Sequence, residues 1–155
     1  MPEGAAHPRY AAAVPKDPAM ARSRIPDALE MKRLKYAADI APADKDRVGE
    51  ALRAASRRSE ALLLCEGRPD HPRLREDHAW AIESGSSFTL SALRRLGVAI
   101  SDDDLRACAR SAEAKERWFD AYKCYEKLAD ETSLARVRER LPNYKVAIPD
   151  NKKDS

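Results

Sequence analysis

Cysteine and histidine are the residue types in this chain that could ligate a metal ion or act as nucleophile and base. Cys65, His71 and His78 stand closest together in sequence, with Asp70 and Asp77 as possible further ligands. Zinc ligands usually come in short pairs such as C-x2–4-C or H-x3–5-H, because both side chains must reach one ion. Here the intervening stretches have five and six residues, which fits no such pattern. A metal site at Cys65, His71 and His78 is therefore kept as an alternative, and no cofactor is expected.

The other two cysteines, Cys108 and Cys124, lie among apolar residues at helical spacing. A catalytic cysteine needs a thiolate beside a base, and neither residue has a histidine near it in sequence. The acidic run after Ser101 is explained by capping of a helix start. The five glycines are dispersed, so no phosphate-binding loop is expected. These observations predict that the protein is not an enzyme.

Arginine occurs in small clusters that could bind phosphate or an acidic partner. The clusters are Arg53, Arg57 and Arg58; Arg68, Arg73 and Arg75; Arg94 and Arg95; and Arg136 and Arg140. Acidic residues are interspersed with them, which favours solvated faces with local ion pairs. Binding of nucleic acid through these arginines is kept as an alternative but is not expected.

Aromatic residues gather in the second half of the chain. The group comprises Trp80, Phe88, Trp118, Phe119, Tyr122 and Tyr125. Trp118 and Phe119 are adjacent, so they point to different sides of a helix, one toward the core and the other toward solvent. Exposed aromatic and arginine side chains are frequent anchors for partner proteins. The predicted partner-binding residues are Arg53, Arg57, Trp80, Trp118 and Phe119.

The composition favours helices and argues against a sheet. The 155 residues are 43% hydrophobic, 35% charged and 6% aromatic, and the net charge is +3. The charge excess is too small to imply nucleic acid by itself. The chain has neither an apolar run near 18 residues nor the apolar stretch of a signal peptide. An odd count of cysteines without paired spacing suggests reduced thiols, so a cytoplasmic protein without membrane contact is expected.

Helix signals divide the chain into successive elements. Pro26 and Asp27 suit the first turn of a helix, whose apolar side is expected to contain Leu29, Arg33 and Tyr36, extended by Met31 and Leu34. Three antiparallel hairpins are then expected over 43–67, 72–97 and 101–129, and a last helix after Asp130. The prediction is seven or eight helices in one helical-repeat domain over 25–141. Proline-rich residues 1–24 are expected to form a flexible arm, with Tyr10, Val14 and Met20 as possible anchors, and residues 142–155 a flexible tail.

An internal repeat relates the first and third hairpins. The stretch from Arg57 to Glu66 matches that from Arg117 to Glu126 with an offset of 60 residues, and Ala61 corresponds to Ala121. A small residue there allows two helices to approach closely. A weaker middle copy at an offset of 30 aligns His78, Ile82 and Phe88 with Val48, Leu52 and Arg58.

These matches carry a resemblance to a known family. The stretch 112–128, AEAKERWFDAYKCYEKL, resembles the junction and second helix of a tetratricopeptide repeat, in which an acid and an alanine are followed by an aromatic residue. The resemblance covers residues 52–66 and 105–128. The period is shorter than 34, the turn lacks the usual glycine, and no proline closes each repeat. The resemblance implies a short solenoid or compact helical bundle that binds another protein, as an adaptor or scaffold subunit of a larger assembly.

Overall fold

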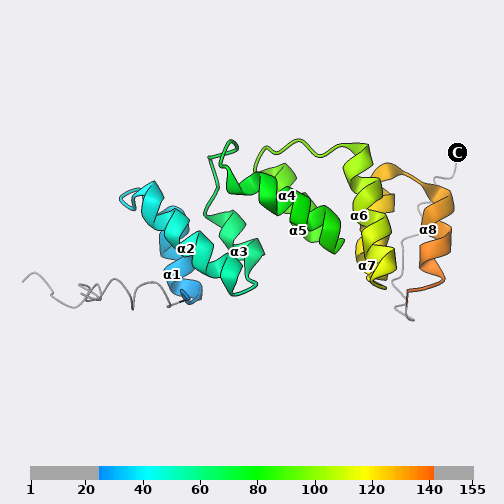
Figure 1. Ribbon diagram of the computed structural model, residues 1–155, viewed down its shortest axis with the longest axis horizontal. Coiled ribbons are helices and arrows are strands. Elements are labelled where there is room, and N and C mark those ends of the chain that lie inside the picture. Colours follow the sequence, from blue (N-terminus) through cyan, green and yellow to red (C-terminus); the bar gives the residue numbers. More distant parts are fainter. Residues whose placement is uncertain (1–24, 142–155) are drawn as a thin grey trace, which may run out of the picture. The chain divides into compact units, whose positions relative to one another are not determined.

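The computed structural model describes residues 25–141, which form eight helices and no strand (Figure 1). The helices are α1 (Ala28–Tyr36), α2 (Pro42–Ala54), α3 (Arg58–Leu63), α4 (Arg73–Ser84), α5 (Ser87–Arg95), α6 (Asp102–Ala114), α7 (Trp118–Leu128) and α8 (Glu131–Arg138). The predicted all-α class is confirmed. None of the helices within 25–141 has both the length and the apolarity needed to cross a membrane. The predicted arm 1–24 and tail 142–155 lie outside the described residues.

The helices fall into two compact units, whereas one domain over 25–141 was expected. The first unit ends at Glu66 and the second begins at Gly67. Gly67 has a φ of +76°, in the left-handed region that glycine adopts most readily. The loop that follows contains Pro69 and Pro72 before α4 starts. The boundary therefore coincides with the strongest break that the sequence contains.

The first unit has a small core built from α1, α2 and α3. Met31, Leu52, Ala61 and Leu64 are buried together, with Leu34 and Val48 packed against them. Asp27 begins α1 through a capping box, in which Asp27 accepts from the Glu30 backbone N–H and Glu30 accepts from that of Asp27.

The predicted buried side of α1 is only partly right. Met31 and Leu34 do reach the core, but Leu29 and Tyr36 are 76% and 69% exposed, and Arg33 is exposed as well. Residues 29, 33 and 36 share one side of a helix, as the spacing requires. That side faces solvent because α1 meets its unit through the side that carries Met31.

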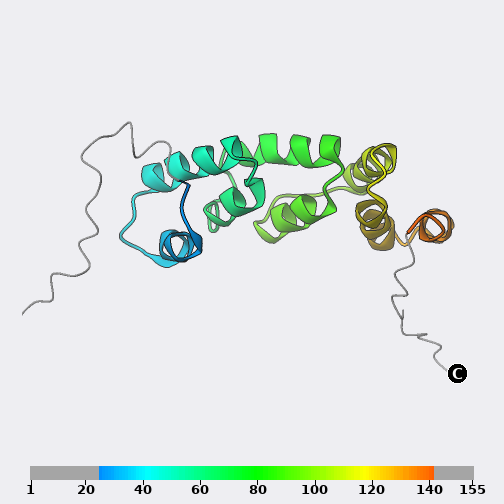
Figure 2. The ribbon, with the colours of Figure 1, turned by 90° about the horizontal axis from the view of Figure 1, so that it is seen from below.

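The second unit packs α4, α6, α7 and α8 in sequence, with α5 against α4 and α7. In Figure 2 the helices α6, α7 and α8 are seen nearly end-on, while α4 and α5 lie across the view. The residues buried in this unit include Leu74, Ala81, Leu90, Leu93, Leu105, Cys108, Ala112, Ala121, Cys124, Leu134 and Val137. The side chains along α6 and α7 that face each other are mostly small, which is what close hairpin packing needs.

Three antiparallel hairpins occur where they were predicted, and their first helices end in the same way. Each ends in a residue with positive φ, followed by a backbone hydrogen bond that reaches five residues back, as in a Schellman motif. The positive-φ residues are Ser56, Gly85 and Glu116. The bonds are Arg57 N to Leu52 O, Ser86 N to Ala81 O and Arg117 N to Ala112 O, each 2.8 Å.

These turns correct the register of the middle copy by one residue. Ala81, not Ile82, stands where Leu52 and Ala112 stand, and all three are fully buried, whereas Ile82 is half-buried. The same shift places Asp77 in the buried position and leaves His78 half-buried. A constant offset of 30 failed because the two loops between hairpins differ in length. The prediction that Ala61 and Ala121 face a neighbouring helix is confirmed, because both are 0% exposed.

Candidate partner-binding surface

The N-terminal half of α7 presents three aromatic side chains within five residues. Phe119 is 61% exposed, and Trp118 and Tyr122 are half-buried. Positions 118 and 122 are one turn apart, as are 119 and 122, so the three rings cover adjoining parts of the helix surface. An exposed phenylalanine at the centre of such a group leaves apolar area in contact with water, which favours a binding role.

Basic side chains from α7 and from the end of α8 lie over these rings. Lys123 Nζ is 5.6 Å from the centre of the Phe119 ring and 5.9 Å from that of Tyr122. Arg138 lies 5.7 Å from the Tyr122 ring, and Arg140 lies 5.8 Å from that of Trp118. Such cation–π contacts hold ring and cation in place with about 0.5–1 kcal/mol each at exposed sites.

We call these six residues the aromatic–cationic surface: Trp118, Phe119, Tyr122, Lys123, Arg138 and Arg140. The hydrogen bond with Tyr122 raises the pKa of the Arg138 guanidinium further above its already high value, so the charge is permanent. The surface therefore offers apolar ring faces bordered by fixed positive charge, which suits an amphipathic partner.

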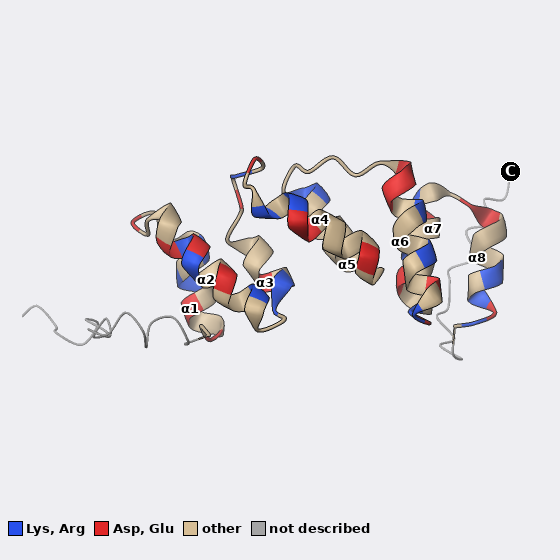
Figure 3. Ribbon diagram, viewed as in Figure 1, with Lys and Arg blue, Asp and Glu red and all other residues tan. Residues whose placement is uncertain are grey.

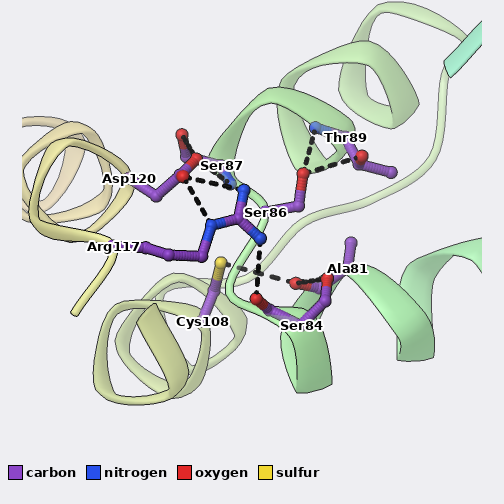
Figure 4. Close-up of polar contacts among 8 residues, drawn as sticks. All are labelled: Ala81, Ser84, Ser86, Ser87, Thr89, Cys108, Arg117 and Asp120. Carbon is purple, nitrogen blue, oxygen red and sulfur yellow. Dashed lines mark hydrogen bonds and ion pairs between the residues drawn. The ribbon is translucent and has the colours of Figure 1, made fainter. Parts of the chain in front are cut away.

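An ion pair at the start of α7 connects the turn of the third hairpin to the second hairpin (Figure 4). Arg117 Nε and Nη2 donate to Asp120 Oδ2 at 3.0 and 2.9 Å, and Arg117 Nη1 donates to the Ser84 carbonyl at 2.9 Å. Asp120 Oδ1 accepts from the Ser87 backbone N–H at 3.0 Å and from its hydroxyl at 2.7 Å. The pair thus satisfies groups at the end of α4 and at the start of α5, which leave their own backbone partners unmade.

A second cation strengthens this connection. Lys115 Nζ donates to the Glu83 carbonyl, so two positive charges from the third hairpin meet the C-terminal end of α4. Cations are favoured there because the helix dipole is negative at that end. This arrangement fixes where the first turn of α7, and hence Trp118 and Phe119, is presented.

The helix α8 is fixed to the third hairpin by one carboxylate. Glu113 on α6 accepts from the Tyr125 hydroxyl on α7 at 2.6 Å and from Arg136 Nη2 on α8 at 2.9 Å. The hydrogen bond from Arg136, with one from Tyr125, lowers the pKa of Glu113 although burial opposes this. Since Arg138 and Arg140 follow Arg136, this contact also positions the cations of the surface.

The five predicted binding residues are divided between the units. Arg53 and Arg57 lie in the first, where Arg53 pairs with Glu50 at 3.6 Å and its side chain is only 9% exposed. Arg57 donates to both oxygens of Glu60 and, at 3.2 Å, to the carbonyl of Pro26, so its bonds connect the α2–α3 turn to the segment before α1. Both arginines therefore have structural partners within their own unit.

The other three predicted residues lie in the second unit. Trp80 is on α4 and is 38% exposed. Trp118 and Phe119 lie side by side at the start of α7, the second helix of its hairpin, rather than on the first helices where a groove was expected. Only Trp118 and Phe119 therefore belong to the aromatic–cationic surface.

Sequence reasoning missed Lys123 and the pairing of the α8 arginines with particular rings. The spacing of Phe119 and Lys123, one turn apart, was a usable signal. Nothing in the sequence indicated that Arg138 and Arg140 would meet Tyr122 and Trp118, because this requires α8 to pack against α7.

The cysteines and histidines considered first form other contacts. His78 Nε2 lies 3.1 Å from Asp104 Oδ2, and His71 Nδ1 accepts from the Arg73 backbone N–H at 3.2 Å. Cys65 is 3% exposed, with its thiol 3.9 Å from the Ala61 carbonyl. A search of the described part of the chain finds no group of three histidine, cysteine or acidic residues arranged to hold a metal ion.

The two remaining cysteines are inside the third hairpin. Cys108 and Cys124 are both 0% exposed and are free thiols. The hydrogen bond with Cys124, together with burial, raises the pKa of the Cys108 thiol, so it stays protonated. As predicted, both cysteines are core residues.

Taken together, the described residues define an all-helical protein of antiparallel hairpins that carries an exposed aromatic–cationic surface on its last hairpin and final helix. No protein-family model, curated protein or solved structure matches the chain.

Proposed function

We propose that this protein is a non-enzymatic interaction module, an adaptor subunit that binds another protein through the aromatic–cationic surface. The observation that carries the proposal is Phe119, which is 61% exposed between Trp118 and Tyr122 and under the Lys123 ammonium group. Aromatic residues beside arginine are the types that dominate binding energy in protein interfaces. The tetratricopeptide resemblance of residues 105–128 agrees with this function by analogy.

The anchoring of this surface adds support. The Arg117–Asp120 pair fixes the start of α7, and Glu113 fixes α8, so the rings and cations are held before a partner arrives. A preorganised surface loses less side-chain entropy on binding, which leaves more of the contact energy as affinity.

Site-specific photocrosslinking tests the proposal, because Phe119 has a matched control in the same unit. Phe88 is 60% exposed and is the second residue of α5, just as Phe119 is the second residue of α7. The photoreactive residue p-benzoylphenylalanine replaces either phenylalanine in the full chain, expressed in the cells that naturally make it. We expect a discrete crosslinked protein from position 119 that position 88 does not give. Identical crosslinks from both positions, or none from 119, would contradict the proposal.

A further inference from the structure

A second group of cations adjoins the aromatic–cationic surface. Arg94 and Arg95 end α5, while Lys123 and Lys127 lie one turn apart on α7, and we call these four residues the cationic cluster. Lys127 Nζ donates to the Ser91 hydroxyl on α5, which brings the α7 lysine to the end of α5 that carries both arginines. Because Lys123 belongs to both groups, the cations continue directly from the ring faces of Phe119 and Tyr122.

The positive charges of the cationic cluster act on one another. Desolvation lowers the pKa of Lys127, and the charges of Arg94, Lys123 and Arg95 lower it further. Of the four, Lys123 pairs with Glu126 at 3.0 Å, in a contact whose side chains are 40% and 48% exposed. An exposed pair of this kind contributes little and exchanges easily with other carboxylates. The cluster thus has a positive field that an external anionic group would relieve.

The charge of this unit is segregated rather than in excess. Basic and acidic residues are equally numerous in residues 67–141. Figure 3 shows acidic residues gathered at the start of α6, where Asp102, Asp103 and Asp104 follow one another, and basic residues on the far half of α8. Arg94 donates to the Ile100 carbonyl at 3.3 Å, so the cationic cluster ends close in sequence to this acidic turn.

We propose that the cationic cluster and the aromatic–cationic surface together bind an acidic segment of the partner protein, with carboxylates on Arg94, Arg95 and Lys127 and an apolar side chain on the ring of Phe119. This inference rests on the proposed function and specifies the partner that it requires. A short segment with a few carboxylates matches a small cluster next to an apolar ring. A nucleic acid would need cations along a longer track, and the acidic start of α6 would repel its phosphates.

Fluorescence anisotropy on the full chain tests this inference with defined probes. The first probe is a labelled 14-residue peptide in which glutamates flank a central Phe-Leu pair, and the second has glutamine in place of every glutamate. The third is a labelled oligothymidine of similar length. We expect at least tenfold tighter binding of the glutamate peptide than of the other two, and weaker binding as salt is added, because salt screens exposed charges.

Two charge-matched double variants locate the site. Arg94→Gln with Arg95→Gln should weaken binding of the glutamate peptide about tenfold. Arg75→Gln with Arg110→Gln removes the same charge from exposed positions on α4 and α6 and should change binding less than twofold. Circular dichroism checks that both variants keep the helicity of the parent chain. Equal losses in the two variants would assign binding to net charge and overturn the inference.

The remaining outcomes separate this inference from the proposed function. Equal binding of the two peptides, or tighter binding of oligothymidine, overturns the acidic partner. If position 119 still crosslinks a discrete protein in that case, the interaction module stands and only the partner chemistry is wrong. If position 119 crosslinks nothing, the proposed function itself fails, whatever the peptides do.

Discussion

At the scale of single residues, Glu113 is the carboxylate with the most connections between helices. It joins α6 to α7 through Tyr125 and to α8 through Arg136, and its side chain is 17% exposed. Its hydrogen bonds are to a charged donor and to a hydroxyl, and hydrogen bonds to charged groups are worth about 1.5–3 kcal/mol. Because its charge is retained by those bonds, the contribution of Glu113 to stability depends on pH.

Replacing Glu113 with glutamine should therefore lower stability in a pH-dependent way. The pKa of Glu113 in the folded state lies below its usual value of 4.5, chiefly because of Arg136. Its stabilisation is complete above that value and is lost as pH falls toward the folded-state pKa. Urea unfolding should show Glu113→Gln less stable than the parent by about 1–2 kcal/mol at pH 7, with a clearly smaller difference at pH 3.5. A difference that is the same at both pH values would contradict this role.

Asp120 makes a second residue-scale prediction, with Glu60 as its counterpart in the first hairpin. Asp120 accepts from the Ser87 backbone and hydroxyl as well as from Arg117, and its side chain is 17% exposed. Glu60 pairs with Arg57 and is 37% exposed. Asp120→Ala should cost about 1–3 kcal/mol, because it leaves the start of α5 without its acceptor. Glu60→Ala should cost about 0–1 kcal/mol.

Thermal and urea unfolding of these two variants measure the difference. If Asp120→Ala is no more destabilising than Glu60→Ala, the connection between the second and third hairpins contributes nothing beyond an ordinary surface ion pair.

The candidate surface could be predicted from the sequence only in part. Adjacent aromatic residues in a helix must point to different sides, and this rule correctly indicated that one of Trp118 and Phe119 would be exposed. Arg53 and Arg57 could not be excluded in the same way. Their partners, Glu50 and the Pro26 carbonyl, become evident only once the turns and α1 are in place.

At the scale of elements, the closest helix approach in the second unit occurs at a glycine. A Cβ added to Gly85 would lie 2.5 Å from the Ala112 backbone nitrogen and 2.6 Å from its Cα atom. The φ of Gly85 is +69°, so this residue also ends α4 in the left-handed region. The turn of the second hairpin therefore rests directly on the backbone of α6.

The variant Gly85→Ala should be strongly destabilising, and Gly67→Ala is its control. Gly67 also has a positive φ, of +76°, but an added Cβ there would meet nothing within 4 Å. Gly67→Ala should cost only the left-handed strain of about 1–2 kcal/mol. Gly85→Ala should cost about 3 kcal/mol or more, because α4 and α6 must also move apart. Urea unfolding of both variants measures the difference, and equal losses would show that the close approach is not tight.

Helix starts were easier to predict than helix ends. Asp27, Ser101 and Asp130 were expected to begin helices, and each accepts a hydrogen bond from the backbone N–H three residues on. Such caps depend on local sequence alone. The ends at Ser56 and Glu116 carried no signal, because neither is a residue that prefers positive φ. There the packing of the hairpin imposes the backbone conformation.

At the scale of the whole molecule, each unit has a core of its own. Leu52 is fully buried in the first unit and Leu93 in the second. The sequence showed the glycine and proline break near residue 67 but not that it separates two cores. Whether apolar stripes on successive hairpins merge or stay apart depends on contacts between hairpins, and these are not encoded in helical periodicity.

Separate cores predict that the two units lose stability separately. Removing a fully buried leucine side chain costs about 2–5 kcal/mol, paid where its neighbours are. Leu52→Ala should therefore increase amide exchange throughout residues 42–63 and leave residues 102–128 protected, while Leu93→Ala should do the reverse. Hydrogen exchange followed by mass spectrometry measures both regions in one sample. Each variant is the control for the other, since both remove the same atoms from a helix interior. If either substitution loosens both regions equally, the units unfold as one cooperative structure and the boundary at Gly67 has no energetic meaning.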